Sequence, residues 1–295
     1  MKSLKGIFPS LLTPFDTNSR INAKALRLLV RLNLKKGVDG FYVCGSTGEA
    51  FLLNLRERKE ILETALDEAC GKCAIIAHVG CLSTDDTIEL ARHAAACGVD
   101  AVSSVTPFYY PYTWEEIRQY YYELADSVSV PVIVYNFPAR TGIALTLERA
   151  SCFALDGRFA GIKHTSQDFF ALERFKHLRP DFIMYNGYDE MFLSGLAAGA
   201  DGGIGSTYNF MAEKFITIKS LFEQGKHKEA REIQKQVNDI IAVLVQFGVL
   251  QTEKAILTYM GIECGECRRP FLPLDDEKMK IVREIVEKNH FQASE

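Results

Sequence analysis

The stretch Phe159-Ala160-Gly161-Ile162-Lys163-His164-Thr165 places a lysine at the end of a short apolar run. Such runs are typical of parallel strands that helices cover on both faces. Burial disfavours the charged form of a lysine and lowers its pKa, which leaves an amine able to attack a carbonyl group and form a Schiff base. The alternative is a lysine whose ammonium group reaches water from the strand end. Tyr135, at the end of an earlier run of the same type, favours the first interpretation.

Seven further apolar runs recur along the chain, and helical patterns fill the gaps between them. The eight runs lie at residues 7–12, 41–44, 74–79, 101–105, 132–135, 160–163, 182–185 and 203–205. Strands that alternate with helices in this way predict an α/β fold, a (β/α)8 TIM barrel. The alternative is a doubly wound open sheet, but its glycine-rich turn after the first strand is missing, because Thr13-Pro14-Phe15 stands there.

Helical patterns continue after the eighth run, at residues 226–247, 251–260 and 275–289. We therefore expect residues 1–225 to form the barrel and residues 226–295 to form a C-terminal helical extension packed on it. The two parts are expected to be one structural domain, because no linker or low-complexity stretch separates them.

The composition is that of an ordinary globular chain, with 295 residues, 47% hydrophobic and 24% charged. The net charge of -4 and the lack of a basic tract predict no binding to nucleic acid. No apolar run approaches the ~18 residues of a membrane helix, and no signal region opens the chain, so no membrane association is expected. Eight scattered cysteines without a signal peptide indicate a reducing cytoplasm. The pairs Cys70/Cys73 and Cys264/Cys267 are too far apart in the sequence to predict a zinc site.

The active site of a TIM barrel lies at the C-terminal ends of its strands. Here these ends carry one lysine, several hydroxyl groups and the carboxylate pair Asp189-Glu190, without the spacing of a metal site. This set suits imine chemistry without metal or cofactor: Lys163 would attack the keto carbon of a 2-keto acid, and Tyr135 would transfer protons. Ser46 and Thr47 would hold the substrate carboxylate with their hydroxyl and backbone N–H groups. The alternatives are that Tyr135 only packs and that the Gly-Ser-Thr-Gly segment is only a turn.

Four motifs together resemble the pyruvate-dependent class I aldolase family, which includes the dihydrodipicolinate synthases and the N-acetylneuraminate lyases. These motifs are Gly45-Ser46-Thr47-Gly48-Glu49, Val105-Thr106-Pro107-Phe108-Tyr109-Tyr110, Tyr135-Asn136-x-Pro138 and Gly161-Ile162-Lys163. The resemblance runs from about residue 6 to residue 273. Residues 185–190 and 199–209 are similar to the lyase branch, which cleaves sialic acid, whereas Arg140 resembles the synthase branch.

Carried over by position, the resemblance implies a role for each matching residue. Lys163 is the Schiff-base lysine, Tyr135 transfers protons, and Ser46 and Thr47 bind the pyruvate carboxylate. The residues implied to bind the sugar part are Thr165, Gly187, Asp189, Glu190 and Ser206, and Tyr110 is implied to reach the site of a neighbouring subunit. The activity implied is reversible cleavage of N-acetylneuraminate (sialic acid) to N-acetylmannosamine and pyruvate by a homotetramer that uses no cofactor.

Three other functions fit parts of the pattern. A related aldolase or synthase would use the same imine with another aldehyde. A phosphate-binding barrel would use residues 202–206 as its phosphate loop, but the nearby carboxylates Asp189 and Glu190 argue against a dianionic ligand. A carbohydrate-binding barrel without catalysis would not need both Lys163 and Tyr135.

Overall fold

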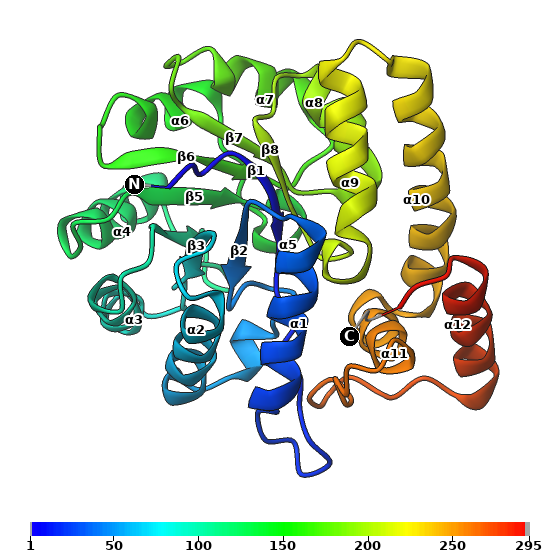
Figure 1. Ribbon diagram of the computed structural model, residues 1–295. Coiled ribbons are helices and arrows are strands. Elements are labelled where there is room, and N and C mark those ends of the chain that lie inside the picture. The colour runs from blue at the N-terminus through cyan, green and yellow to red at the C-terminus, as the bar shows by residue number, and fades with distance from the viewer. Residues whose placement is uncertain (1, 293–295) are drawn as a thin grey trace.

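Eight parallel strands form the centre of the computed structural model, which describes residues 2–292 (Figure 1). The strands are β1 (Gly6–Pro9), β2 (Gly40–Val43), β3 (Ala74–His78), β4 (Ala101–Val105), β5 (Val132–Asn136), β6 (Phe159–His164), β7 (Ile183–Asn186) and β8 (Gly202–Gly205). Their hydrogen-bonded order is β1-β8-β7-β6-β5-β4-β3-β2. The ring closes just beyond β1, where Ser10 bridges Tyr42 of β2 and the Leu11 N–H donates to the Tyr42 carbonyl at 2.9 Å. The predicted TIM barrel is therefore confirmed.

Helices follow the strands and surround the barrel (Figure 1). They are α1 (Ala23–Lys36), α2 (Leu55–Ala69), α3 (Thr84–Ala96), α4 (Trp114–Asp126), α5 (Pro138–Thr141), α6 (Leu147–Ala154), α7 (Phe169–Lys176), α8 (Phe192–Ala197) and α9 (Tyr208–Glu223). Two short 3-10 helices, η1 (Ala50–Leu52) and η2 (Asp189–Met191), follow β2 and β7. Local sequence fixes several helix starts: Asn54 and Glu57 form a reciprocal capping box at α2, and Thr113 and Glu116 form another at α4.

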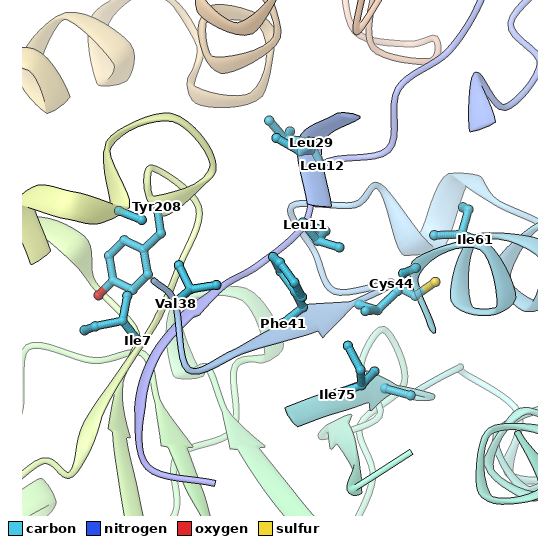
Figure 2. Close-up of a cluster of buried hydrophobic side chains, with 14 of the residues drawn as sticks. Ile7, Leu11, Leu12, Leu29, Val38, Phe41, Cys44, Ile61, Ile75 and Tyr208 are labelled. Atoms are coloured by element: carbon cyan, nitrogen blue, oxygen red, sulfur yellow. The ribbon is translucent and has the colours of Figure 1, made fainter. Parts of the chain in front are cut away.

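Alternating side chains divide the core into two layers. Phe41 of β2 and Ile75 of β3 belong to the outer layer, which also contains Leu29 of α1 and Ile61 of α2 (Figure 2). Successive residues of a strand point to opposite faces, so Tyr42 lies in the inner layer. The same alternation acts in β6, where Ile162 belongs to the outer layer. Lys163 must therefore point into the barrel.

Three helices follow the barrel and form the C-terminal extension: α10 (His227–Phe247), α11 (Val249–Tyr259) and α12 (Asp276–Lys288). Their bounds agree with the predicted helices to within two residues at each end. Helix α10 packs on α9, and α11 packs on α9, α10 and α12 (Figure 1). The first residue of the predicted barrel segment, Met1, and the last three residues of the predicted extension, 293–295, lie outside the described residues.

No single helix in the described part of the chain combines the length and apolar composition of a membrane span; α10 and α11 meet the criterion only as a pair, which is bent by 117°.

The first strand is shorter than the predicted run of residues 7–12. It ends at Pro9, and the chain then leaves β8 for β2. The Leu12 N–H donates to the Asn209 side chain at 3.2 Å and not to a neighbouring strand. A side chain from α9 thus replaces the strand pairing that the apolar run predicted.

Candidate active site

Lys163 lies inside the barrel at the C-terminal end of β6, and only 4% of its surface is exposed. Its Nζ atom lies 4.1 Å from the centroid of the Tyr135 ring and 4.4 Å from that of Tyr42. Within residues 2–292 it forms no ion pair with a carboxylate. Burial lowers the pKa of Lys163 to about 7, against the opposing effect of the Asp189 charge. A substantial fraction of this lysine is therefore an unprotonated amine near neutral pH.

Tyr135 is the neighbour of Lys163 across the β5–β6 pairing and is also buried. Burial raises the pKa of Tyr135 to about 12, although the nearby hydroxyl groups of Thr165 and Ser46 partly oppose this rise. The phenol thus keeps its proton at rest and can donate it. The three residues that the sequence placed at the ends of different strands, Ser46, Tyr135 and Thr165, are brought together here.

Two residues that sequence reasoning missed, Tyr42 and His78, line the site beside Lys163. The Nδ1–H of His78 donates to the Cys44 carbonyl at 2.9 Å, and its Nε2 accepts from the Val105 N–H at 3.2 Å. Burial holds the pKa of His78 well below its usual value, so the ring is neutral. The rings around Lys163 exclude water and carry no negative charge, so desolvation of the ammonium group outweighs its attraction to the ring faces. The alternation within β2, with Phe41 and Val43 facing outward, was a sequence signal that could have placed Tyr42 inside the barrel, although not in the site.

The segment from Gly45 to Glu49 is a compact turn whose Ser46 and Thr47 stay partly accessible. The Gly48 N–H donates to the Gly45 carbonyl at 3.0 Å, and the Glu49 N–H donates to the Ser46 carbonyl at 3.1 Å. The segment is therefore a turn, and its partly accessible Ser46 and Thr47 are compatible with ligand binding. Glu49 anchors the turn to α11, because its carboxylate forms an ion pair with Lys254 of that helix at 2.6 Å.

Gly187 and Thr165 lie against each other on the opposite side of the site. A Cβ atom on Gly187 would lie 1.9 Å from the Thr165 hydroxyl oxygen, so a side chain at position 187 would collide with that hydroxyl. Glycine at this position lets the backbone after β7 approach β6 closely. Thr165 and the Gly187 backbone can therefore serve one ligand.

Asp189 is buried next to the end of β8. Its Oδ2 atom accepts hydrogen bonds from the Thr207 backbone N–H at 2.9 Å and the Thr207 hydroxyl at 2.6 Å. Burial raises the pKa of Asp189 to about 6, although the hydrogen bonds from Thr207 oppose this rise. A Cβ atom on Gly205 would lie 2.0 Å from Asp189 Oδ1. The carboxylate thus occupies the space before α9 that a phosphate would need, which disfavours the phosphate-binding alternative.

Glu190 and Ser206 are half-buried, and they complete the predicted sugar side of the site. The charge of Glu190 acts on Asp189 and on the neighbouring Tyr188. Burial raises the pKa of Tyr188 as it does that of Tyr135, and the positive charge of Arg140 opposes both shifts, so Arg140 lies near the same region.

Tyr110 is a predicted site residue that does not contact Lys163 or Tyr135 within the described chain. It is 59% exposed and meets Tyr109, itself 83% exposed, edge to face at 5.1 Å. In the described chain no hydrogen bond or ring contact joins Tyr110 to Lys163 or Tyr135. An expected contribution to a neighbouring subunit's site is compatible with this exposure.

One group of possible metal ligands occurs among residues 2–292: Glu63 of α2 with His93 and Cys97 near α3. It lies on the outer helices α2 and α3. The Nε2 atom of His93 already pairs with the Glu63 carboxylate at 2.8 Å. The site around Lys163 contains no such group in the described chain.

Comparisons with known proteins agree with this geometry. The model of the dihydrodipicolinate synthetase family matches residues 3–289. The chain is 44% identical over 275 residues to an N-acetylneuraminate lyase from Enterobacter sp. (strain 638), which covers 92% of this chain and 93% of that protein. It is 42% identical to the N-acetylneuraminate lyase of Citrobacter koseri, with 97% of each chain covered.

Solved structures show the same similarity. The structure of CdNal from Clostridium difficile in complex with mannosamine superposes with a TM-score of 0.95 at 38% identity and covers 97% of this chain and 99% of that one. The Ruminococcus gnavus sialic acid aldolase, solved as a catalytic lysine mutant, superposes with a TM-score of 0.94 at 34% identity. The match covers 99% of this chain and 100% of that one. A dihydrodipicolinate synthase superposes with a TM-score of 0.91 at 27% identity, and the match covers 97% of this chain and 99% of that one.

Proposed function

The chain belongs to the dihydrodipicolinate synthetase family, and from that premise we propose that it is a class I aldolase that cleaves N-acetylneuraminate reversibly to N-acetyl-D-mannosamine and pyruvate. The observation that carries the proposal is Lys163, a buried lysine without an ion-pair partner in the described chain, whose amine lies against Tyr135. Identity is higher to the N-acetylneuraminate lyases, at 42–44%, than to the dihydrodipicolinate synthase structure, at 27%. This difference favours sialic acid as the substrate.

The first half of the reaction forms the imine. The neutral amine of Lys163 adds to the C2 carbonyl of the open-chain keto acid and gives a carbinolamine. Tyr135 donates its proton to the carbinolamine oxygen, which leaves as water, so that an iminium ion and a phenolate remain. The high pKa of the Tyr135 phenol suits this role, because the proton is present when it is needed.

The second half breaks the carbon–carbon bond. The Tyr135 phenolate removes the proton of the C4 hydroxyl, the C3–C4 bond breaks, and its electron pair neutralises the iminium ion to an enamine. N-acetylmannosamine leaves as the aldehyde. Protonation of C3 by Tyr135 and addition of water to the imine then release pyruvate and restore both side chains.

The remaining residues would bind the two ends of the substrate. Ser46 and Thr47 would hold the carboxylate of the pyruvate part with the turn that Glu49 and Lys254 anchor. Thr165, Gly187, Asp189, Glu190 and Ser206 would bind the sugar hydroxyl groups, which need both donors and acceptors. Asp189 Oδ1, the oxygen that Thr207 leaves free, is an available acceptor.

A second candidate is a synthase that condenses pyruvate with another aldehyde, and the observation that favours it is Arg140 near Tyr135 and Tyr188. One comparison separates the two. The purified protein should condense pyruvate with N-acetylmannosamine faster than with aspartate semialdehyde at equal aldehyde concentration. The reverse order of rates would assign it to the synthase branch.

We also propose a cytoplasmic homotetramer in which Tyr110 reaches a neighbouring subunit. The support is the exposure of Tyr109 and Tyr110, which is typical of an interface. Light scattering should give the mass of four chains, and Tyr110→Ala should weaken the assembly. A fully active monomer at nanomolar concentration would contradict the proposal.

A further inference from the structure

Glu253 has a fully buried carboxyl group that takes no part in the proposed reaction. It lies on α11 with 0% of its surface exposed, between Thr252 and Lys254, which are also buried. Lys254 is engaged with Glu49 and with the Glu266 carbonyl at 3.1 Å. Neither carboxyl oxygen of Glu253 has a partner in good hydrogen-bonding geometry among residues 2–292. A buried carboxyl without a partner is costly, so its presence needs an explanation.

Two polar groups that act on Glu253 belong to the proposed sugar side of the site. The Ser206 hydroxyl is close enough to act on the pKa of Glu253, and the Asp189 charge acts on it as well. Ser206 follows β8 and is half-buried, so it connects the buried carboxyl to the accessible part of the site. Burial raises the pKa of Cys267, in the loop after α11, and the charge of Glu253 adds to that rise.

The surroundings of Glu253 favour its protonated, neutral form. Burial raises the pKa of Glu253 to about 8, and the negative charge of Asp189 adds to this rise, while Ser206 opposes it. A protonated carboxyl group has an O–H donor that a carboxylate lacks. If that O–H donates to Ser206, the serine's own hydrogen is left to point away from α11, towards the ligand.

We propose that Glu253 is a positioning residue of the substrate site, which acts through Ser206 to direct that hydroxyl group towards the sugar end of the substrate. The C-terminal extension thereby takes part in sugar recognition, because α11 carries Glu253. Glu253 itself does not touch the substrate, since it has no exposed surface. The inference rests on the proposed function, in which Ser206 binds the sugar.

A double-mutant cycle between positions 253 and 206 tests the proposal. Glu253→Met removes the donor with little change of volume and should raise the KM for N-acetylmannosamine about tenfold, roughly the effect of one lost hydrogen bond. The KM for pyruvate should stay unchanged. In the Ser206→Ala background, which lacks the hydroxyl that Glu253 directs, the same change should alter the KM for N-acetylmannosamine by less than about twofold.

Two matched variants separate positioning from a structural role. Glu253→Gln keeps a donor and an acceptor and should retain a KM near that of the wild type. Glu253→Met should raise the melting temperature, because burying a carboxyl group costs more free energy than a single contact with Ser206 returns. Higher stability with poorer sugar binding is the pattern expected of a residue kept for function.

Other outcomes would overturn the role of Glu253. These are an equal effect of Glu253→Met with and without the Ser206 hydroxyl, an equal rise of the pyruvate KM, and a Gln variant as poor as the Met variant. Glu253→Leu is the second apolar variant, and misfolding of both apolar variants would identify the carboxyl as a structural requirement instead.

Wild-type activity is measured separately, so the two hypotheses can fail independently. If the wild type does not accept N-acetylmannosamine, the proposed function is wrong. The cycle is then measured on the aldehyde that the enzyme does accept with pyruvate. Coupling between positions 253 and 206 decides the role of Glu253 whatever that aldehyde is.

Discussion

Two lysines of this protein are buried to nearly the same degree, but their surroundings differ. Lys163, in the barrel, is 4% exposed and lies between the rings of Tyr42 and Tyr135. Lys254, on α11, is 1% exposed, pairs with the Glu49 carboxylate at 2.6 Å and lies 4.2 Å from the centroid of the Phe15 ring. Both lysines thus contact an aromatic face, and only Lys254 has a carboxylate partner.

The comparison shows that burial alone does not make a lysine a nucleophile. A carboxylate at hydrogen-bonding distance stabilises the ammonium form, whereas neutral rings and a more distant Asp189 do not offset the desolvation of Lys163. Lys163 should therefore be dispensable for stability and essential for activity, whereas Lys254 should be required for stability. Substitutions at the two lysines and at Tyr135 test this contrast.

The largest effect is expected for Lys163→Met. The variant lacks the nucleophile, so cleavage should fall to the uncatalysed background and borohydride with pyruvate should add no mass to the peptide. Its stability should equal or exceed that of the wild type, because no buried partner is left unpaired. Mass spectrometry and thermal melting measure the two properties. Pyruvate labelling that persists in this variant would refute Lys163 as the imine-forming residue.

The next effect is expected for Tyr135→Phe. This change keeps the ring against Lys163 and removes only the hydroxyl group. The loss of general acid–base catalysis should lower kcat by about 10²–10⁴-fold, and pyruvate should still be trapped on Lys163. Steady-state kinetics and borohydride trapping measure these effects. A higher KM with an unchanged kcat would instead mean that Tyr135 only binds the substrate.

Lys254→Met is expected to reduce stability. The change leaves the buried carboxylate of Glu49 without its ion-pair partner, which should cost about 3–5 kcal/mol of unfolding free energy. Denaturant unfolding measures the loss. In the control, Lys254→Met combined with Glu49→Gln should recover most of it, because no buried charge then remains. A single variant as stable as the wild type would break the proposed contrast between the two lysines.

The smallest effect is the dependence on pH. Because the pKa of Lys163 is about 7, the rate of imine formation should fall about tenfold per pH unit well below pH 7, as the amine becomes protonated. Rapid-mixing trapping at several pH values measures this slope. A rate that stays constant from pH 5 to 8 would contradict a titrating Lys163.

The same titration predicts how stability changes with pH. The pKa of Lys163 is lowered in the folded state, so between pH 7 and the usual lysine range the unfolded chain binds more protons. The burial penalty of Lys163 is thus complete below pH 7 and decreases as the pH rises. The stability advantage of Lys163→Met should therefore shrink from pH 7 to pH 10.

Much of the catalytic centre could be predicted from the sequence because it depends on local pattern. Eight apolar runs separated by helical segments predicted the barrel, and the barrel predicted that strand ends form the site. Lys163, Tyr135 and Ser46 were identified in this way and Thr165 from the family resemblance, and the structure brings the four residues together. Tyr42 and His78 were missed because they are inward-facing residues within apolar strands, where nothing local distinguishes a site wall from core packing.

The sequence by itself determined the order of strands and helices, the position of a lysine at the end of an apolar strand, and the C-terminal helices. Only the tertiary structure decided which buried polar groups find partners. Lys254 and Glu49 are far apart in the sequence, and the helical pattern of α11 gives no sign that Thr252, Glu253 and Lys254 would be buried. The reason is physical: desolvation and pairing depend on which segments meet in space, whereas periodicity records only which face of each segment is apolar.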